Sequence, residues 1–176
     1  MPGVPNCVFL SLGSTKDRRF AGWAAFRNAI GAARIVGETP AVPPVTSPVD
    51  AQAVSAPVGV WRLLASNNRE LARSWRAYPS FEAACAEVER LQQRADALQI
   101  AVVRGESASH YGWFALLDGE PVISSGRWFG ASSTSQHSAE TALAELALAT
   151  ITEAPAPVAA QSKSRLSLRS STASRS

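Results

Sequence analysis

The stretch Trp61-Arg62-Leu63-Leu64-Ala65 returns further along the chain as Trp113-Phe114-Ala115-Leu116-Leu117, and an alanine-rich segment follows each copy. The tryptophans lie 52 positions apart, whereas the serines that follow them, Ser74 and Ser125, lie 51 apart, because the second turn is one residue shorter. A unit that cannot bury its apolar face alone packs against its twin. The repeat therefore predicts one shared core formed by two similar halves.

The first copy has the pattern of a hairpin, a helix and a further strand. Residues 60–65 and 70–74 are apolar strand candidates separated by a turn of serine and asparagine. Ser80 is suited to cap a helix that begins near Phe81, because its hydroxyl can accept a backbone hydrogen bond. Residues 99–104 then predict another strand.

The second copy repeats this pattern, with Asp118-Gly119 as the stronger of the two hairpin turns. Residues 121–125 return as a strand, and in the helices the spacing between copies becomes 55, as for Leu91 and Leu146. Four residues are therefore inserted in the lead-in to the second helix, which is rich in serine and threonine. We expect these side chains to cap that helix.

The predicted core combines the matched tryptophans with alternating strand residues and one face of each helix. Cys85 falls on the same helical face as Phe81 and Val88, which predicts a buried, small apolar side chain. The predicted core residues are Trp61, Leu63, Phe81, Cys85, Val88, Leu91, Trp113, Ala115, Leu143 and Leu146.

Charge is distributed unevenly along the chain. The formal net charge is +3, yet residues 57–153 carry eight arginines against eleven acids, and residues 1–36 and 161–176 each carry a net charge of +4. The positive charge thus lies on the ends rather than on the predicted folded face. The two cysteines, Cys7 and Cys85, are too few for a disulfide framework and do not have the close spacing of a zinc site, so we expect no metal and no cofactor.

Composition divides the chain into five parts. Repeat one, 58–104, and repeat two, 105–153, together form one predicted globular domain. Residues 1–36 are a basic N-terminal extension of uncertain order, and residues 37–57 are a linker rich in proline, alanine and valine. Residues 154–176 are a tail rich in serine and arginine, with too little apolar surface to offset the entropy of ordering, so we expect disorder there.

No uncharged stretch reaches the roughly 20 apolar residues that a membrane-spanning helix needs. Residues 20–36 come nearest, but Arg27 and Arg34 fall within their apolar arc. The pair Arg18-Arg19 resembles a twin-arginine export signal, and the interrupted apolar stretch behind it argues against export. We therefore expect a cytoplasmic protein without a membrane span.

Residues 64–84 resemble the short motif of the YegP-like domains, a bacterial family of unknown function often found as tandem copies. The motif consists of a strand, an asparagine-containing turn, a second strand ending at Ser74, an aromatic residue at Tyr78 and an alanine-rich helix. In the second copy Asp118-Gly119 stands at the turn. The chain departs from the family at Asn68, where a glycine is usual.

This resemblance implies an α+β fold built by tandem duplication of a β(3)-α-β unit. The two units would form one antiparallel sheet with two helices packed on it, related by a pseudo-twofold axis and with their last strands exchanged. The third strand of each unit, near residues 76–78 and 127–129, follows from the resemblance rather than from the residue pattern.

The sequence offers no clear catalytic constellation. One Ser/His/acid arrangement can be assembled, from His137, Ser132, Ser133, Ser135 and Glu140. The local sequence lacks the exposed nucleophile turn and the oxyanion site that such chemistry needs. His110 precedes a strand at Tyr111 and lacks the partner spacing of a metal ligand. We therefore expect no catalytic, metal-binding or cofactor-binding residues.

A candidate binding surface combines arginines with aromatic residues near the ends of the two hairpins. Guanidinium groups and aromatic faces together can bind phosphates and unstacked bases, and exposed tryptophans can form a groove for a peptide. The alternative is an edge strand whose charges discourage aggregation. The candidate residues are Arg69, Arg73, Trp75, Arg76, Tyr78, Arg127 and Trp128.

Two functional hypotheses remain open at this stage. The first is a non-catalytic interaction or structural module that binds an unidentified protein partner or self-associates through its sheet edges. The second is a binder of anionic polymers, above all nucleic acid, through the arginine-rich tails and the Arg69–Arg76 hairpin. The acidic balance of residues 57–153 favours the first hypothesis.

Overall fold

The computed structural model describes residues 3–37 and 58–154, so the predictions for the linker at 38–57 and the tail at 155–176 lie outside the described residues. The elements in chain order are β1 (Asn6–Leu12), α1 (Arg18–Ala32), β2 (Arg34–Ile35), β3 (Val58–Leu64), β4 (Glu70–Ser74), α2 (Phe81–Gln93), the short 3-10 helix η2 (Ala95–Ala97), β5 (Gln99–Arg104), β6 (Tyr111–Leu117), β7 (Glu120–Ser124), α3 (Ser132–Leu148) and β8 (Thr150–Glu153).

The strands form one mixed eight-stranded sheet in the order β2-β5-β6-β7-β4-β3-β1-β8. Neighbouring strands pair antiparallel, except that β8 runs parallel to β1. The predicted α+β class is confirmed, whereas the prediction of a wholly antiparallel sheet with two helices is wrong. Both differences arise from the N-terminal segment, which adds a third helix and the strand beside which β8 lies.

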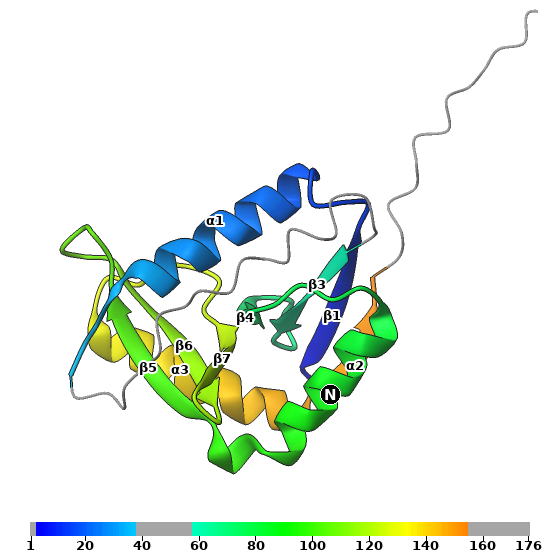
Figure 1. Cartoon of the computed structure of the whole chain (residues 1–176). Coiled ribbons are helices and arrows are strands. Elements are labelled where there is room, and N and C mark those ends of the chain that lie inside the picture. The colour runs from blue at the N-terminus through cyan, green and yellow to red at the C-terminus, as the bar shows by residue number, and fades with distance from the viewer. Residues whose placement is uncertain (1–2, 38–57, 155–176) are drawn as a thin grey trace, which may run out of the picture.

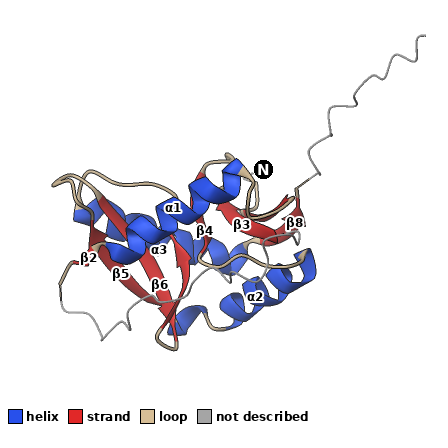
Figure 2. Cartoon of the chain, turned by 45° about the horizontal axis from the view of Figure 1, so that its top comes forward, coloured by secondary structure: helices blue, strands red, loops and turns tan. Residues whose placement is uncertain are grey.

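Helices cover both faces of the sheet (Figures 1 and 2). Helices α2 and α3 pack on one face, over a core cluster that contains Trp61 and Trp113. Helix α1 crosses the opposite face, where Phe20, Trp23 and Ile30 pack against the other sides of the same strands. The fold is therefore a three-layer arrangement with the sheet in the middle.

The N-terminal extension, predicted as a separate region of uncertain order, is part of the domain between Asn6 and Ile35. Strand β1 pairs with β3 along its whole length, with Phe9 opposite Trp61. Strand β2 extends the other edge of the sheet by pairing with β5. The backbone groups of this segment are thus satisfied by partners far away in the sequence, which local composition does not reveal.

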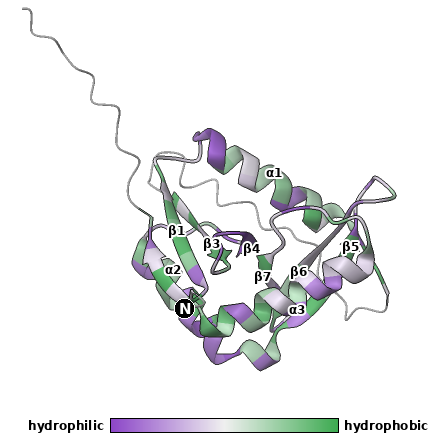
Figure 3. Ribbon diagram, turned by 180° about the vertical axis from the view of Figure 1, so that it is seen from behind, coloured by the Kyte–Doolittle hydropathy of each residue, from purple (hydrophilic) through white to green (hydrophobic). Residues whose placement is uncertain are grey.

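Helix α1 forms even though arginine interrupts its apolar stripe, and hydrophilic turns alternate with hydrophobic ones along it (Figure 3). Arg27 is only 6% exposed and lies over the Trp23 ring, 4.9 Å from its centroid. Its guanidinium donates to the Trp75 carbonyl at 3.4 Å and to the Asn28 side chain at 3.1 Å. Burial lowers the pKa of Arg27, yet these contacts allow the arginine to stay inside.

The prediction of exchanged last strands holds for one half and fails for the other. Strand β5, which follows the first helix, pairs with β6 and places Val102 opposite Trp113. Strand β8, which follows the second helix, does not reach β3, because β1 lies between them.

The third strands predicted near 76–78 and 127–129 are reduced to single bridges. Tyr78 exchanges two backbone hydrogen bonds with Gly59, and Phe129 exchanges two with Tyr111. Only a few residues separate each second strand from the following helix, so the chain has length for one bridging pair and no more.

Buried serines explain why each hairpin ends in the same residue type. The Ser74 hydroxyl accepts a hydrogen bond from the Trp61 backbone N–H at 3.2 Å, and Ser125 accepts one from the Trp113 N–H at 3.3 Å. Both hairpins carry a register shift shortly after the tryptophan. The shift lies between Leu63 and Leu64 in the first hairpin and between Ala115 and Leu116 in the second. Asn68, with φ of 62°, adopts the left-handed conformation that favours glycine.

The structure places most predicted core residues in or against the cluster beneath α2 and α3. Cys85 is the exception, because it is only half-buried and stands outside that cluster. Its neighbour Ala84 takes the inward position on α2, so Cys85 lies at the margin of the buried face. The prediction of Cys85 as a core residue is corrected accordingly.

The two cysteines give a test of how firmly β1 is docked. Cys7 on β1 is fully buried, and burial raises the pKa of its thiol to about 12. The thiolate is the reactive form, so near pH 8 we expect Cys7 to resist an aromatic disulfide reagent while half-buried Cys85 reacts. Cys85→Ser should remove the fast phase, and denaturant should restore one reactive thiol. Two equally fast thiols in the native protein would contradict the docking of β1.

Candidate functional site

A polar hollow of about 310 Å³ opens between the end of the first hairpin and helix α3. We call it the Arg69–Arg127 hollow. The strand and loop side is lined by Arg69, Glu70, Leu71, Gly126, Arg127 and Phe129. The helix side is lined by Thr134, His137, Ser138 and Thr141.

The helix side of the hollow is a polar stripe at helical spacing. Thr134, His137, Ser138 and Thr141 follow the i, i+3, i+4, i+7 rule and so share one face of α3. The Ser138 hydroxyl accepts a hydrogen bond from the Trp113 indole N–H at 3.3 Å. That bond uses the serine oxygen as acceptor and leaves its hydrogen free to donate.

The strand side carries two arginines without a carboxylate partner among the described residues. The guanidinium groups of Arg69 and Arg127 make no ion pair there, and both side chains are exposed. Arg127 lies over the Phe129 ring at 4.8 Å from its centroid, which restricts where its charge can sit.

Glu70 is the acidic group on the wall of this hollow, and two other arginines already engage it. Its carboxylate accepts from Arg73 at 2.5 Å and from Arg62 at 3.3 Å. A Cβ at Gly126 would overlap the Glu70 carboxylate, so a larger residue there would have to displace the Glu70 side chain. The negative charge of Glu70 is thus neutralised within the protein and does not compensate Arg69 or Arg127.

A second corner of the domain has corresponding sequence positions and different chemistry. Arg76 lies 51 positions before Arg127, and Glu120 lies 51 positions after Arg69. Arg76 and Glu120 form an ion pair at 2.5 Å. We call this place the Arg76–Glu120 corner. Where it holds an opposite-charge pair, the corresponding positions at the hollow hold two positive charges.

Helices α2 and α3 also differ in charge and polarity at corresponding positions. The positions on α2 that lie 55 residues before His137, Ser138 and Thr141 are occupied by Glu82, Ala83 and Ala86. The first turn of α2 contains that acid and is capped by Ser80, which accepts from the Ala83 N–H at 3.1 Å. The first turn of α3 contains no acidic residue, and its N-cap side chain makes no hydrogen bond.

The inserted serine- and threonine-rich segment is a helical turn and not a capping loop, which corrects the prediction. Helix α3 begins at Ser132, after the N-cap Ala131. Ser135, at the position corresponding to the capping Ser80, therefore lies inside the helix. It is fully buried, and its hydroxyl has no hydrogen-bond partner among the described residues. The extra residues form the first turn of α3, so Ser135 lies beyond the N-cap position and does not cap the helix.

The other candidate binding residues do not gather on one surface. Trp75 is only 3% exposed and packs against Phe114 on the α1 side of the sheet. Tyr78 is buried on the opposite side, and burial raises the pKa of its hydroxyl. Arg73 is engaged by Glu70. Successive side chains point to opposite faces of the sheet, so arginines and aromatic residues that alternate along the sequence do not form one mixed surface.

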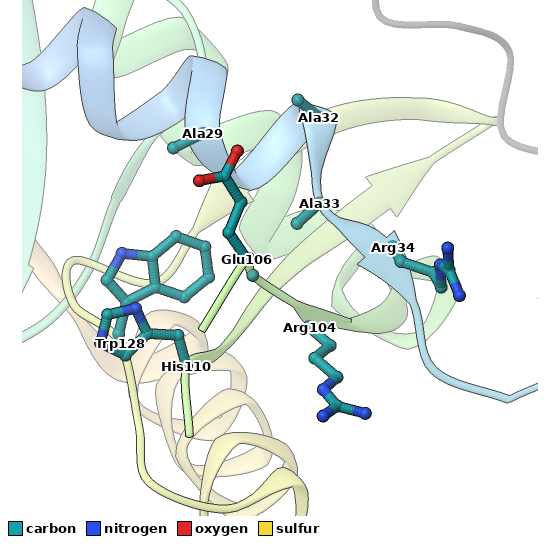
Figure 4. A pocket seen from close by; sticks show the side chains of 9 residues that line it. Ala29, Ala32, Ala33, Arg34, Arg104, Glu106, His110 and Trp128 are labelled. Atoms are coloured by element: carbon teal, nitrogen blue, oxygen red, sulfur yellow. The ribbon is translucent and has the colours of Figure 1, made fainter. Parts of the chain in front are cut away.

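Trp128 lies at a separate cleft of about 480 Å³ near the end of α1. Its ring is half-buried between Phe26 and His110, and the His110 ring stacks on it at 5.7 Å with an interplanar angle of 12°. Figure 4 shows the Glu106 side chain directed toward α1, while Arg34 and Arg104 point outward. Arg34 and Arg104 occupy paired backbone positions in the β2–β5 register. These charged side chains point apart, so they do not converge on one position where a ligand could bind.

The Ser/His/acid arrangement that the sequence offers around His137 is not assembled among the described residues. His137 lies at the hollow, but Ser135 points into the core and Glu140 accepts a hydrogen bond from Gln136 at 2.8 Å. Within residues 3–37 and 58–154 no group of three or more potential metal ligands comes together. No helix in the same part of the chain is both long enough and apolar enough to traverse a bilayer.

Sequence reasoning identified Arg69 and Arg127 but missed the helix side of the hollow. It considered His137 with Ser132, Ser133 and Ser135, which are close in sequence and point in different directions. The stripe formed by Thr134, Ser138 and Thr141 was available as a polar face at helical spacing. What could not be seen was that this face meets the first hairpin.

Comparison with known proteins gives no match: no family model, no curated protein and no solved structure is similar to this chain. The resemblance to YegP-like domains therefore stays a prediction.

The two corresponding serines at the helix starts should respond oppositely to the same substitution. Ser135→Ala removes a buried hydroxyl without a partner and should raise the free energy of unfolding by about 1 kcal/mol. Ser80→Ala removes a helix cap and should lower it by about 1 kcal/mol. Chemical denaturation measures both values. Equal destabilisation by the two variants would show that Ser135 has a partner in solution.

Proposed function

We propose that the domain is a non-catalytic interaction module that binds an acidic group of a partner in the Arg69–Arg127 hollow. The observation that carries this proposal is the absence, among the described residues, of a carboxylate for either arginine, at positions whose counterparts form the Arg76–Glu120 ion pair. An external anion would take the place that Glu120 takes for Arg76.

The electrostatics of the hollow support an anionic partner. Two like charges on one wall repel each other, and a bound anion converts that repulsion into two charge-assisted hydrogen bonds. Arg127 is held over Phe129, so part of the entropic cost of positioning it has already been met. Glu70 is neutralised by Arg62 and Arg73 and so repels an incoming anion less.

The proposal extends to the origin of the two corners. We propose that the domain is a tandem duplication related by a pseudo-twofold axis, as in YegP-like domains. In support, Arg73 pairs with Ser124, which is the residue 51 positions after it, so this pair would lie on the axis. On this view β1 occupies the place of an exchanged last strand in the second half. One of two equivalent corners then kept an ion pair while the other became a binding hollow.

The alternative proposal, nucleic-acid binding through the Arg69–Arg76 hairpin, has less support. Arg73 and Arg76 are engaged by Glu70 and Glu120, and Trp75 is buried. Unstacked bases need exposed aromatic faces beside a continuous basic track. The basic tail lies outside the described residues and remains a candidate for this activity on its charge alone.

Replacing Arg69 with glutamate tests the proposed function directly. Arg69→Glu supplies Arg127 with an internal carboxylate and should weaken binding of a labelled oligoglutamate peptide at least tenfold, measured by fluorescence anisotropy at low salt with the full chain. Arg104→Glu changes the charge equally at an exposed site outside the hollow and is the matched control.

The same assay separates the two proposals. Equal weakening by Arg69→Glu and Arg104→Glu would mean that net charge alone drives binding and would contradict a role for the hollow. A single-stranded oligonucleotide that binds more tightly than the peptide, and loses affinity with Arg73→Gln and Arg76→Gln, would favour the hairpin as a nucleic-acid surface instead.

A further inference from the structure

We infer that the group bound in the Arg69–Arg127 hollow is a phosphoryl group, that is, the dianionic head of a phosphate monoester. This inference rests on the proposed function and names the chemistry of its ligand. The argument comes from the number, the kind and the placement of the donors that line the hollow.

The hollow offers more hydrogen-bond donors than a carboxylate can use. Arg69 and Arg127 present guanidinium forks with five N–H groups each, and Thr134, Ser138 and Thr141 add hydroxyls from the facing helix. A carboxylate has two oxygens in one plane, whereas a phosphoryl group has three strong acceptor oxygens arranged around a tetrahedral centre. Donors from two opposite walls suit the tetrahedral acceptor.

One hydroxyl on the helix side, that of Ser138, donates to no other group among the described residues. Ser138 accepts from the Trp113 indole, which fixes its oxygen and leaves its hydrogen without an assigned acceptor. His137 directly precedes Ser138 and also lines the hollow. Helix α3 brings no acid to its first turn, so its positive end is not neutralised from within that turn.

The size of the hollow fits a head group and not a large cofactor. Its volume of about 310 Å³ is at the lower end of the range for small-molecule sites. Phe129 forms an apolar part of the wall beneath Arg127, which would let a short carbon stem pass beside the phosphoryl oxygens.

The Arg76–Glu120 corner provides an internal comparison. There the corresponding residues are an ion pair and, on α2, Glu82 with Ala83 and Ala86. The Glu120 carboxylate would repel a dianion, and alanines offer no side-chain donor. If the chemistry of the hollow were a by-product of the fold, the two corners would be alike. Instead the arginine at 76 and 127 is common to both, whereas Arg69, His137, Ser138 and Thr141 have Glu120, Glu82, Ala83 and Ala86 as their counterparts.

Titration of the full chain with inorganic phosphate, followed by two-dimensional NMR of backbone and arginine side-chain N–H groups, tests the inference. We expect shifts at Arg69, Arg127 and the first turns of α3, with none at Arg76 or Arg104. Phosphate should bind at least tenfold more tightly than acetate. Arg127→Gln and Arg69→Gln should each lower phosphate affinity about tenfold, Thr141→Val should lower it severalfold, and Arg104→Gln should leave it unchanged.

Three further arms distinguish the source of the group and keep the two proposals separable. Glycerol 3-phosphate probes a small phosphate monoester. A phosphoserine hexapeptide, compared with its glutamate analogue, probes a modified protein. The phosphate compound that binds more tightly than free phosphate identifies the source. Binding of oligoglutamate without binding of any phosphate probe would overturn the phosphoryl assignment and leave the proposed function standing. Binding of neither would overturn both.

Thermal unfolding of the variants tests whether loss of folding explains a loss of phosphate affinity. Thermal unfolding should show that Arg69→Gln, Arg127→Gln and Thr141→Val remain folded, since these side chains line a surface hollow. Phosphate affinity that stays the same in folded Arg69→Gln and folded Arg127→Gln would place the ion elsewhere and overturn the inference.

Discussion

The two hairpins meet through a short antiparallel contact in which Arg73 faces Ser124 and Ser74 faces Ile123. Two residue pairs join what would otherwise be two separate sheets, so this junction needs support from both faces. Helix α1 gives it from one side, where the Trp23 indole donates to the Ser74 carbonyl at 2.9 Å and Arg27 donates to the Trp75 carbonyl. On the other side Gln92 of α2 donates to the carbonyls of Leu146 and Ala149, at 2.9 and 2.8 Å.

This junction also positions the two corners discussed above. Because β4 and β7 run antiparallel about the Arg73–Ser124 pair, the residues that leave β4 come close to the start of β7, and those that leave β7 come close to the start of β4. Arg76 thereby reaches Glu120, and Arg127 comes to the hollow that Arg69 lines. The same geometry at both ends, with different side chains, makes one corner internally satisfied and the other receptive to an anion.

The parts of the fold that could be predicted are those set by local chemistry. The hairpin turns at Asn68 and Asp118, the helix cap at Ser80 and the matched tryptophans all depend on neighbours close in sequence. Strand β1 could not be predicted, because its partner β3 lies about fifty residues away in the sequence. Its burial also depends on the edge of β3, with which β8 does not pair. Helix α1 was obscured because Arg27 interrupts its apolar face, and the carbonyl that accepts from Arg27 inside the fold belongs to Trp75, far along the chain in the loop after β4.

The candidate site divides in the same way. The arginines of the hairpins stand out in the sequence, but which of them keep a free charge depends on where Glu70 and Glu120 lie in space. The aromatic residues between those arginines suggested a stacking surface, and strand alternation sends Trp75 and Tyr78 to opposite faces instead. The polar stripe of α3 becomes meaningful only when the hairpin beside it is known.

Double-mutant cycles on the free energy of unfolding, at low salt and without ligand, test the central claim that two corresponding corners carry opposite electrostatics. Alanine substitutions at Arg76 and Glu120 should give a favourable coupling on the order of 0.2–1 kcal/mol, as for an exposed ion pair. Alanine substitutions at Arg69 and Arg127 should give a coupling of the opposite sign, because like charges face one hollow. A favourable coupling between Arg69 and Arg127 would contradict this account.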